Sequence, residues 1–196
     1  MKRININKKL GIPVFNLDIN KTMIHSLNDM DSLIITPIGT PHTPIFIINE
    51  MDKIIDGLWL GGAISEQGLI DNKFTHVLSI IDKKPEHLDS KYFQTKWINI
   101  QDNGNEQIDK YFDECNEFIH QGLRNGGKIY VHCQKGFSRS PSIVIAYLMK
   151  HDKCNTFNEA HQYVASKRPT ICPNLGFILA LHQYDVHTNC NKKIEN

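Results

Sequence analysis

The sequence lacks the features that mark several specialised classes of protein. No apolar run approaches the roughly 20 residues that cross a bilayer, so we expect no membrane span. Lys and Arg number 22 against 21 Asp and Glu, a net charge of +1, so the basic surplus typical of nucleic-acid binders is missing. The basic N-terminus has neither an uninterrupted apolar segment nor the small-residue cleavage site of a secretory signal. We therefore expect an intracellular protein, cytoplasmic or nuclear, with no nucleic-acid partner.

The cysteines and histidines form none of the usual disulfide or metal patterns. The five cysteines are widely scattered without a CxxC pair, and the ten histidines contain no HExxH pattern. A chain of 196 residues can also bury one hydrophobic core without such staples. We therefore expect no disulfide framework, no metal site and no cofactor.

Short β-rich segments alternate with helical patterns from residue 52 onward. Strands are expected at residues 54–60, with a turn at Asp56-Gly57, and at 75–81, 96–100 and 128–132. Apolar residues at helical spacing predict helices at residues 108–123, 141–150, 156–166 and 175–184. This alternation predicts an α/β fold in which helices cover a sheet, with ligands bound at the carboxyl edge of the strands.

Residues 1–50 differ in composition from the rest of the chain. They are rich in Asn, Ile, Thr and Pro, and the segment TPIGTPHTP (36–44) breaks any regular element. The apolar runs 33–36 and 45–48 are candidate edge strands. We interpret residues 1–50 as an N-terminal extension, partly ordered at most, ahead of a globular domain.

The segment KIYVHCQKGFSRSPSIVIAYL (128–148) carries the strongest chemical signal. A buried strand ends at Cys133 and a helix begins near Arg139, while Gly136 and Ser138 let backbone N–H groups of the loop turn inward. The guanidinium of Arg139 returns to the same centre and can hold two phosphate oxygens. Such a positive field also lowers a thiol pKa from ~8.5 to about 3.5–7.5. The alternative is a buried strand-end thiol with a surface arginine, but the combined pattern predicts covalent phosphoryl transfer.

The loop HCQKGFSRS resembles the signature of the cysteine-based protein tyrosine phosphatases, in the short form of the dual specificity phosphatases. IIDGLWLGGA resembles the opening strand of that family, WINIQDNGNEQIDKYFDECNEFI its general-acid loop and following helix, and KRPTICPNLGFILALHQY its closing helix entry. The resemblance covers roughly residues 52–186. It implies the cysteine-phosphatase fold, a central mixed, largely parallel sheet flanked by helices, in a catalytic domain at residues 51–190.

The resemblance also implies the catalytic roles. Cys133 is the nucleophile, Arg139 clamps the phosphate, and Asp102 is the general acid and then the general base. The hydroxyl of Ser140 stabilises the thiolate as it leaves the phosphoenzyme. From the residues alone, Asp102 could instead be a charge placed toward a helix dipole, and Ser140 could be a helix N-cap.

Further residues are expected to bind substrate or to support the loop. The substrate-binding set is Gln134, Lys135, Gly136, Phe137, Ser138 and Arg139. Phe137 is either a pocket wall or plain packing, and Lys135 either favours a more anionic substrate or is simply solvated. The resemblance implies that His132 orients the loop through a hydrogen bond to its backbone, and that Asn174 fixes loops beside the pocket.

These residues, together with the resemblance, imply a metal-independent phosphatase that hydrolyses phosphotyrosine and phosphoserine or phosphothreonine on proteins through a cysteinyl-phosphate intermediate. A phosphoinositide or an RNA 5′-triphosphate is the alternative substrate for the same chemistry. A pseudophosphatase, which only binds phosphorylated sites, is the alternative from another class. The segment Lys8–Ile12 is similar to kinase-docking peptides, which makes a protein kinase a candidate partner, although a solvated tail is the simpler interpretation. Nothing in the pattern sets the oligomeric state.

Overall fold

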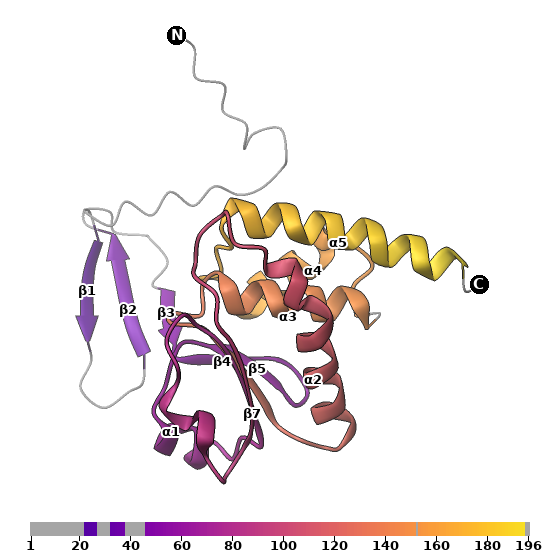
Figure 1. Ribbon diagram of the computed structural model, residues 1–196. Coiled ribbons are helices and arrows are strands. Elements are labelled where there is room, and N and C mark those ends of the chain that lie inside the picture. The colour runs from indigo at the N-terminus through magenta and orange to yellow at the C-terminus, as the bar shows by residue number, and fades with distance from the viewer. Residues whose placement is uncertain (1–21, 27–31, 38–45, 152, 195–196) are drawn as a thin grey trace. The chain divides into compact units, whose positions relative to one another are not determined.

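The computed structural model describes residues 22–26, 32–37 and 46–194, apart from residue 152 (Figure 1). It divides into two compact units, Met1–Asn49 and Glu50–Asn196. The segment 8–12, with its kinase-docking pattern, lies outside the described residues.

The N-terminal unit contains a three-stranded antiparallel sheet. Its strands are β1 (Thr22–Ser26), β2 (Ser32–Pro37) and β3 (Phe46–Asn49), with β2 between the other two. The predicted strands at 33–36 and 45–48 are therefore present, except that residue 45 lies outside the described residues. The interpretation of 33–36 as an edge strand is wrong, because the unpredicted β1 pairs with its second side.

The second unit is built on a five-stranded sheet in the order β4-β5-β8-β6-β7. Only β4 and β5 pair antiparallel, and every other neighbouring pair is parallel. The strands are β4 (Met51–Ile55), β5 (Leu58–Gly61), β6 (His76–Ile80), β7 (Gln94–Ile98) and β8 (Ile129–His132). The predicted mixed, largely parallel sheet is confirmed.

The predicted strand at 54–60 is a hairpin in the structure. Gly57 takes a φ of +79°, which reverses the chain between β4 and β5 at the predicted turn. The strands predicted near 75–81, 96–100 and 128–132 correspond to β6, β7 and β8, within about two residues at each end.

Helices cover both faces of this sheet. They are α1 (Glu66–Asp71), α2 (Phe112–Arg124), α3 (Arg139–Lys150), α4 (Phe157–Lys167) and α5 (Leu175–Ile194), with one-turn 3-10 helices η3 (Glu86–Asp89) and η4 (Ile108–Tyr111). In Figure 1, α3, α4 and α5 lie on one side of the sheet and α1 on the other. The side chains on the two faces form separate hydrophobic clusters.

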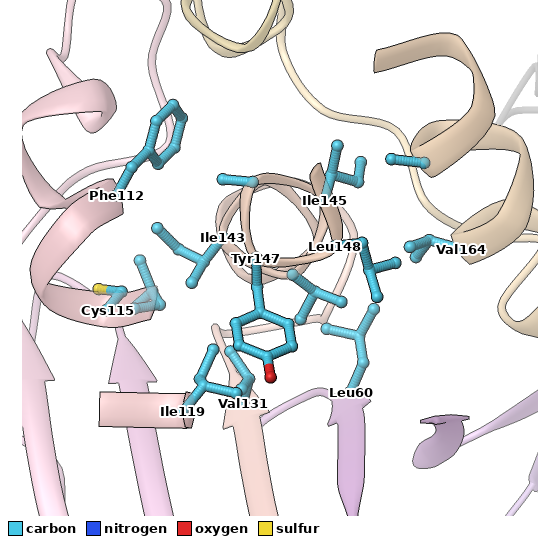
Figure 2. Close-up of a cluster of buried hydrophobic side chains, with 14 of the residues drawn as sticks. Leu60, Phe112, Cys115, Ile119, Val131, Ile143, Ile145, Tyr147, Leu148 and Val164 are labelled. Carbon is cyan, nitrogen blue, oxygen red and sulfur yellow. The ribbon is translucent and has the colours of Figure 1, made fainter. Parts of the chain in front are cut away.

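Helix α3 lies at the centre of the larger cluster, as its apolar sequence predicts. Every residue from Arg139 to Met149 is buried. Figure 2 shows α3 end-on, with Ile119 of α2, Val131 of β8 and Val164 of α4 around it. Helix α3 contacts α2, α4, α5 and the sheet. This packing fixes the position of its first residues, and therefore of the C-terminal end of the loop that precedes it.

Two helical predictions need correction. The last helix runs ten residues beyond the predicted end at Tyr184, to Ile194. Helix α1 was not predicted, because only Leu69 among its six residues is buried and so it has no apolar periodicity. At the start of α4, Thr156 Oγ1 accepts a hydrogen bond from the backbone N–H of Glu159 and so caps the helix.

No helix in the described part of the chain is both long enough and apolar enough to cross a membrane.

Candidate active site

The loop between β8 and α3 lies at the carboxyl edge of the sheet. Its tightest point is Gly136, which takes a φ of +70°. A Cβ atom there would lie only 2.4 Å from the backbone carbonyl carbon of Gly61. Both the positive φ and this close approach therefore require glycine at the position. The backbone N–H of Ala63 also donates to the carbonyl of Gln134, 3.2 Å away. The segment after β5 thus supports this loop from one side.

The sulfur of Cys133 sits at the bottom of the loop, with 2% of the residue exposed. It accepts hydrogen bonds from the backbone N–H of Gly136 and from the hydroxyl of Ser140, each at 3.2 Å. Burial alone would raise the pKa of this thiol. The Ser140 hydroxyl and N–H, the charge of Arg139 and the Gly136 N–H outweigh burial and hold the pKa of Cys133 below its ordinary value.

The guanidinium of Arg139 is buried beside the loop, with 6% of the residue exposed. Its Nη1 donates to the carbonyl of Ile100 at 3.1 Å and to Asp82 Oδ1 at 3.3 Å. Its Nε is buried and has no hydrogen-bond partner among the residues that the structure describes. One side of the fork is therefore fixed by protein acceptors, and Nε remains as a donor for an oxyanion.

Asp102 reaches the same centre from the loop that follows β7. Its Oδ1 accepts hydrogen bonds from Ser138 Oγ at 2.6 Å and from Asn174 Nδ2 at 2.9 Å. Its Oδ2 lies 3.9 Å from Arg139 Nε. Since Oδ1 is occupied by two donors, Oδ2 is the oxygen available for proton exchange beside the arginine.

The structure places both side chains for which the sequence left an alternative open. The carboxylate of Asp102 contacts Ser138, the N-cap of α3, and Asn174, which directly precedes α5, so it lies beside the first residues of two helices as well as beside Arg139. Ser140 lies inside α3, whose N-cap is Ser138, and its hydroxyl points to the sulfur of Cys133. The structure thus brings Cys133, Arg139, Asp102 and Ser140 together.

Asn174 joins three segments around the site. Its side chain donates to Asp102, its backbone N–H donates to Ser138 Oγ at 3.1 Å, and its Oδ1 accepts from the N–H of Phe177 at 3.0 Å. Gly104 and Gly176 pack so closely that a Cβ on Gly176 would lie 2.1 Å from the Gly104 carbonyl oxygen. The start of α5 and the loop that bears Asp102 therefore hold each other in place.

The other predicted residues take up varied environments. His132 is buried, and its Nδ1 lies 3.3 Å from the carbonyl oxygen of Cys133. Gln134 and Lys135 are exposed at the rim of the loop. Phe137 is half-buried, and its carbonyl accepts a hydrogen bond from the N–H of Cys172 at 2.6 Å.

The structure adds a residue to which the sequence analysis gave no role. Arg168 is 2% exposed, and its guanidinium donates to the carbonyls of Gly136 at 3.1 Å and Lys135 at 3.3 Å. Holding these carbonyls on the outside leaves the loop N–H groups facing the sulfur. The contacts of Arg168 join residues more than 30 positions apart in the chain, and no local pattern in the sequence indicates them.

Among the described residues, no group of three or more His, Cys, Asp or Glu side chains is arranged to hold a metal ion. Cys115, Cys133, Cys154 and Cys172 are free thiols.

Comparisons with known proteins show which family this chain is similar to. A family model for the catalytic domain of dual specificity phosphatases matches residues 58–187. Dual specificity protein phosphatase 1 of Arabidopsis thaliana is 40% identical over 141 residues, which are 70% of this chain and 70% of that protein. The crystal structure of DUSP15 matches with a TM-score of 0.66 and 31% identity, over 74% of this chain and 93% of that one. The human tyrosine phosphatase-like serine/threonine/tyrosine-interacting protein matches with a TM-score of 0.64 and 33% identity, over 70% and 96%.

Proposed function

The chain belongs to the dual specificity phosphatase family, and we propose that Cys133, Arg139, Asp102 and Ser140 carry out its reaction. Members of the family are cysteine-based, metal-independent enzymes that act on phosphoproteins. The observation that carries the assignment is the pair of donors, Ser140 Oγ and Gly136 N–H, each 3.2 Å from the sulfur of Cys133. A buried sulfur with two donors and an arginine beside it is a nucleophile prepared as a thiolate.

The first step transfers the phosphoryl group to sulfur. The Cys133 thiolate attacks phosphorus, so that an S–P bond forms while the P–O bond to the substrate's Ser, Thr or Tyr oxygen breaks. Arg139 holds phosphate oxygens through its guanidinium, with Nε as the free donor. Asp102 gives the proton on Oδ2 to the departing oxygen, because its Oδ1 already accepts two hydrogen bonds.

The second step hydrolyses the phosphocysteine. Asp102, now a carboxylate, takes a proton from water while the water oxygen attacks phosphorus. The S–P bond breaks, inorganic phosphate forms, and the electron pair returns to sulfur. The hydroxyl of Ser140 donates to the sulfur as its charge develops, which stabilises the leaving thiolate.

Loop residues 134–138 supply the rest of the phosphate site in this proposal. The backbone N–H groups bind the phosphate oxygens, and the Arg168 guanidinium keeps the carbonyls of Lys135 and Gly136 turned away from it. His132 and Asn174 support the loop and the acid without contacting phosphate. The exposed Lys135 adds a positive charge at the rim.

Turnover of an aryl phosphate in the presence of a chelator tests the proposal. We expect hydrolysis without added metal, and rapid acid quench during turnover should trap a phosphate attached to Cys133. Rates on a phosphotyrosine peptide, a phosphothreonine peptide and a phosphoinositide then rank the substrate classes. Hydrolysis that depends on a divalent cation, or the absence of any trapped phosphocysteine, would overturn the mechanism.

A binding module without turnover is the second candidate, favoured by the likeness to a human protein described as phosphatase-like and interacting. The presence of Cys133, Arg139 and Asp102 in one centre favours the enzyme instead. A tight complex with a phosphopeptide, combined with no release of phosphate over hours, would decide for the binding module.

We further propose an intracellular location, either cytoplasmic or nuclear, and a protein kinase as a partner. A thiolate nucleophile needs a reducing compartment, because low-pKa thiols oxidise readily elsewhere. The kinase proposal rests only on the pattern in Lys8–Ile12. A pull-down assay tests the kinase proposal by comparing the intact chain with a variant in which Lys8 and Lys9 are replaced by Ala. We expect the intact chain to bind the kinase and the variant to lose this binding.

A further inference from the structure

Next to His132, which supports the phosphate-binding loop, lie two further buried polar side chains that have no role in the reaction described above. Ser79 of β6, His87 of η3 and His132 of β8 are 1%, 5% and 2% exposed. Ser79 Oγ lies 2.8 Å from His132 Nε2 and 3.0 Å from His87 Nε2. The three side chains therefore form a row that runs from His87 through Ser79 to His132, the residue directly before the nucleophile.

The sheet register sets up this row. In the parallel pairing of β6 with β8, Ser79 is the direct partner of His132, and two residues earlier Val77 is the partner of Tyr130. Side chains alternate along a strand, so Ser79 and His132 share the face on which Val77 and Tyr130 pack. Helix η3 follows β6 and brings His87 over the same face, with ring centroids of His87 and His132 5.4 Å apart.

The three hydrogen bonds in this row can be assigned donors and acceptors in only one consistent way. His132 Nδ1 faces the carbonyl oxygen of Cys133, which can only accept, so Nδ1 carries the proton. Burial, and next the charge of His87, lower the pKa of His132 to about 4, so the ring is neutral near pH 7 and its Nε2 is an acceptor. Ser79 must then donate its single proton to His132 Nε2, and His87 Nε2–H must donate to Ser79 Oγ.

We propose that Ser79 and His87 are positioning residues that lock His132 in its Nδ1–H form and so fix the carbonyl of Cys133 at the start of the phosphate-binding loop. Neither touches the substrate, and both act through His132. This proposal deepens the function proposed above and rests on it. With the Cys133 carbonyl held toward His132, the peptide that follows is oriented and the Gly136 N–H can reach the sulfur.

Two nearby groups affect the state of His87. Burial lowers the pKa of His87, while the charges of Glu66 and Glu86 act in the opposite direction. The proton on Nε2 is present in both the neutral Nε2–H form and the doubly protonated ring, so the bond to Ser79 survives either state. Protonation of His87 therefore leaves the hydrogen bonds from His87 to Ser79 and from Ser79 to His132 in place.

Replacing Ser79 with Ala tests the proposal, with Ser79→Thr as the conservative variant. ¹⁵N NMR of the imidazoles should show His132 as the Nδ1–H form in the full-length wild type and in Ser79→Thr, and a mixture of forms in Ser79→Ala. We expect kcat/KM for an aryl phosphate to fall about 3- to 10-fold in Ser79→Ala, the worth of one hydrogen bond, and to recover in Ser79→Thr. The pH at which the Cys133 thiol is alkylated at half its maximal rate should rise in Ser79→Ala but not in Ser79→Thr.

A second pair of variants tests the outer residue. His87→Gln keeps an amide donor near the position of Nε2, whereas His87→Leu removes it, so the first should stay close to wild type and the second should resemble Ser79→Ala. His76→Gln is the matched control, a buried histidine on the same strand that bonds Thr75 instead, and it should leave the His132 spectrum unchanged.

The imidazole spectrum and the alkylation profile require no turnover, so they separate this proposal from the proposed function. A wild type without phosphatase activity would overturn the function. An unaltered His132 spectrum and thiol profile in Ser79→Ala, or equal behaviour of His87→Gln and His87→Leu, would overturn the positioning role.

Discussion

Arg168 and Asp52 are 116 residues apart in the chain, and Arg168 Nη1 lies 2.7 Å from Asp52 Oδ2. The arginine is almost fully buried and the aspartate side chain is 15% exposed. The same guanidinium donates to two carbonyls of the phosphate-binding loop. This ion pair therefore links β4, at the edge of the sheet, to the loop that holds the nucleophile.

Replacing Arg168 with Met should destabilise the fold and impair the site together. Removal of one partner of a buried pair leaves the other charge uncompensated, which costs about 3–5 kcal/mol. The loop carbonyls of Lys135 and Gly136 also lose their donor. Urea unfolding should show the loss of stability, and kcat/KM for an aryl phosphate at a temperature where the variant is folded should fall.

A surface pair provides the control. Lys53 and Asp56 form an ion pair at 2.7 Å, but the side chain of Asp56 is 99% exposed. Lys53→Ala should leave both stability and turnover close to wild type, because solvent screens an exposed pair. If Arg168→Met had the same stability and turnover as Lys53→Ala, the hydrogen bonds from Arg168 to the loop carbonyls would have no role in either property.

Replacing Cys133 with Ser should abolish turnover while the affinity for phosphate remains. A serine hydroxyl keeps the shape of the loop, but its oxygen is not ionised near pH 7, so no covalent intermediate forms. Single-turnover kinetics measure the first effect, and competition by inorganic phosphate measures the second. Cys154→Ser, at a thiol whose pKa burial raises, should keep wild-type rates. Appreciable turnover in Cys133→Ser would remove this residue as nucleophile.

Local sequence predicts the centre of the candidate site. Cys133 and Arg139 lie in one strand-loop-helix segment, and their spacing predicts that they meet around one point. Asp102 and Ser140 were assigned through the resemblance to the phosphatase family, and a loop that follows a parallel strand does open at the same edge of the sheet. Chemistry that lies within one supersecondary unit is visible in sequence.

The supports of the site could not be found in the same way. Ser79 meets His132 only through the register of β6 with β8, and Asp82 reaches Arg139 from the loop after β6. A buried arginine such as Arg168 and a surface one have the same letter in the sequence. Helix α1 was missed for a related reason, since a six-residue helix with one buried side chain leaves no period to detect.

Replacing Asp102 with Asn should lower turnover by about 10²–10⁴ while the loop keeps its position. An amide oxygen can still accept from Ser138 Oγ and Asn174 Nδ2, so only the proton donor is lost. The alkaline limb of the pH profile of kcat/KM should disappear, because that limb reports loss of the proton from the acid. Asp109→Asn, at an exposed position on η4, should keep both limbs. A persistent alkaline limb in Asp102→Asn would assign the acid to another residue.

Replacing Arg139 with Lys should lower kcat by about 10²–10³, the usual cost of losing an oriented donor to a transition-state oxyanion. In the wild type, Nη1 of the guanidinium donates to the Ile100 carbonyl and to Asp82, while Nε has no hydrogen-bond partner within the described part of the chain and can donate to phosphate. The single ammonium group of a lysine cannot make the protein contacts and the phosphate contact together. Steady-state kinetics and the inhibition constant of inorganic phosphate measure the effect. Arg124→Lys, at the exposed end of α2, should behave as wild type.

Replacing Ser140 with Ala should separate the two steps of the reaction. The hydroxyl is a main cause of the lowered pKa of Cys133, so in Ser140→Ala the thiol pKa should rise and the acid limb of kcat/KM should move to higher pH. Below that pKa the sulfur is protonated and inactive, which fixes the direction of the change. Departure of the thiolate from phosphorus should slow more than its attack, since the developing charge on sulfur loses its donor. Stopped-flow measurement should therefore show a burst of aryl alcohol followed by slow turnover, which the exposed control Ser166→Ala should not show. An unchanged acid limb without a burst would mean that the 3.2 Å contact between Ser140 and Cys133 contributes nothing to either step.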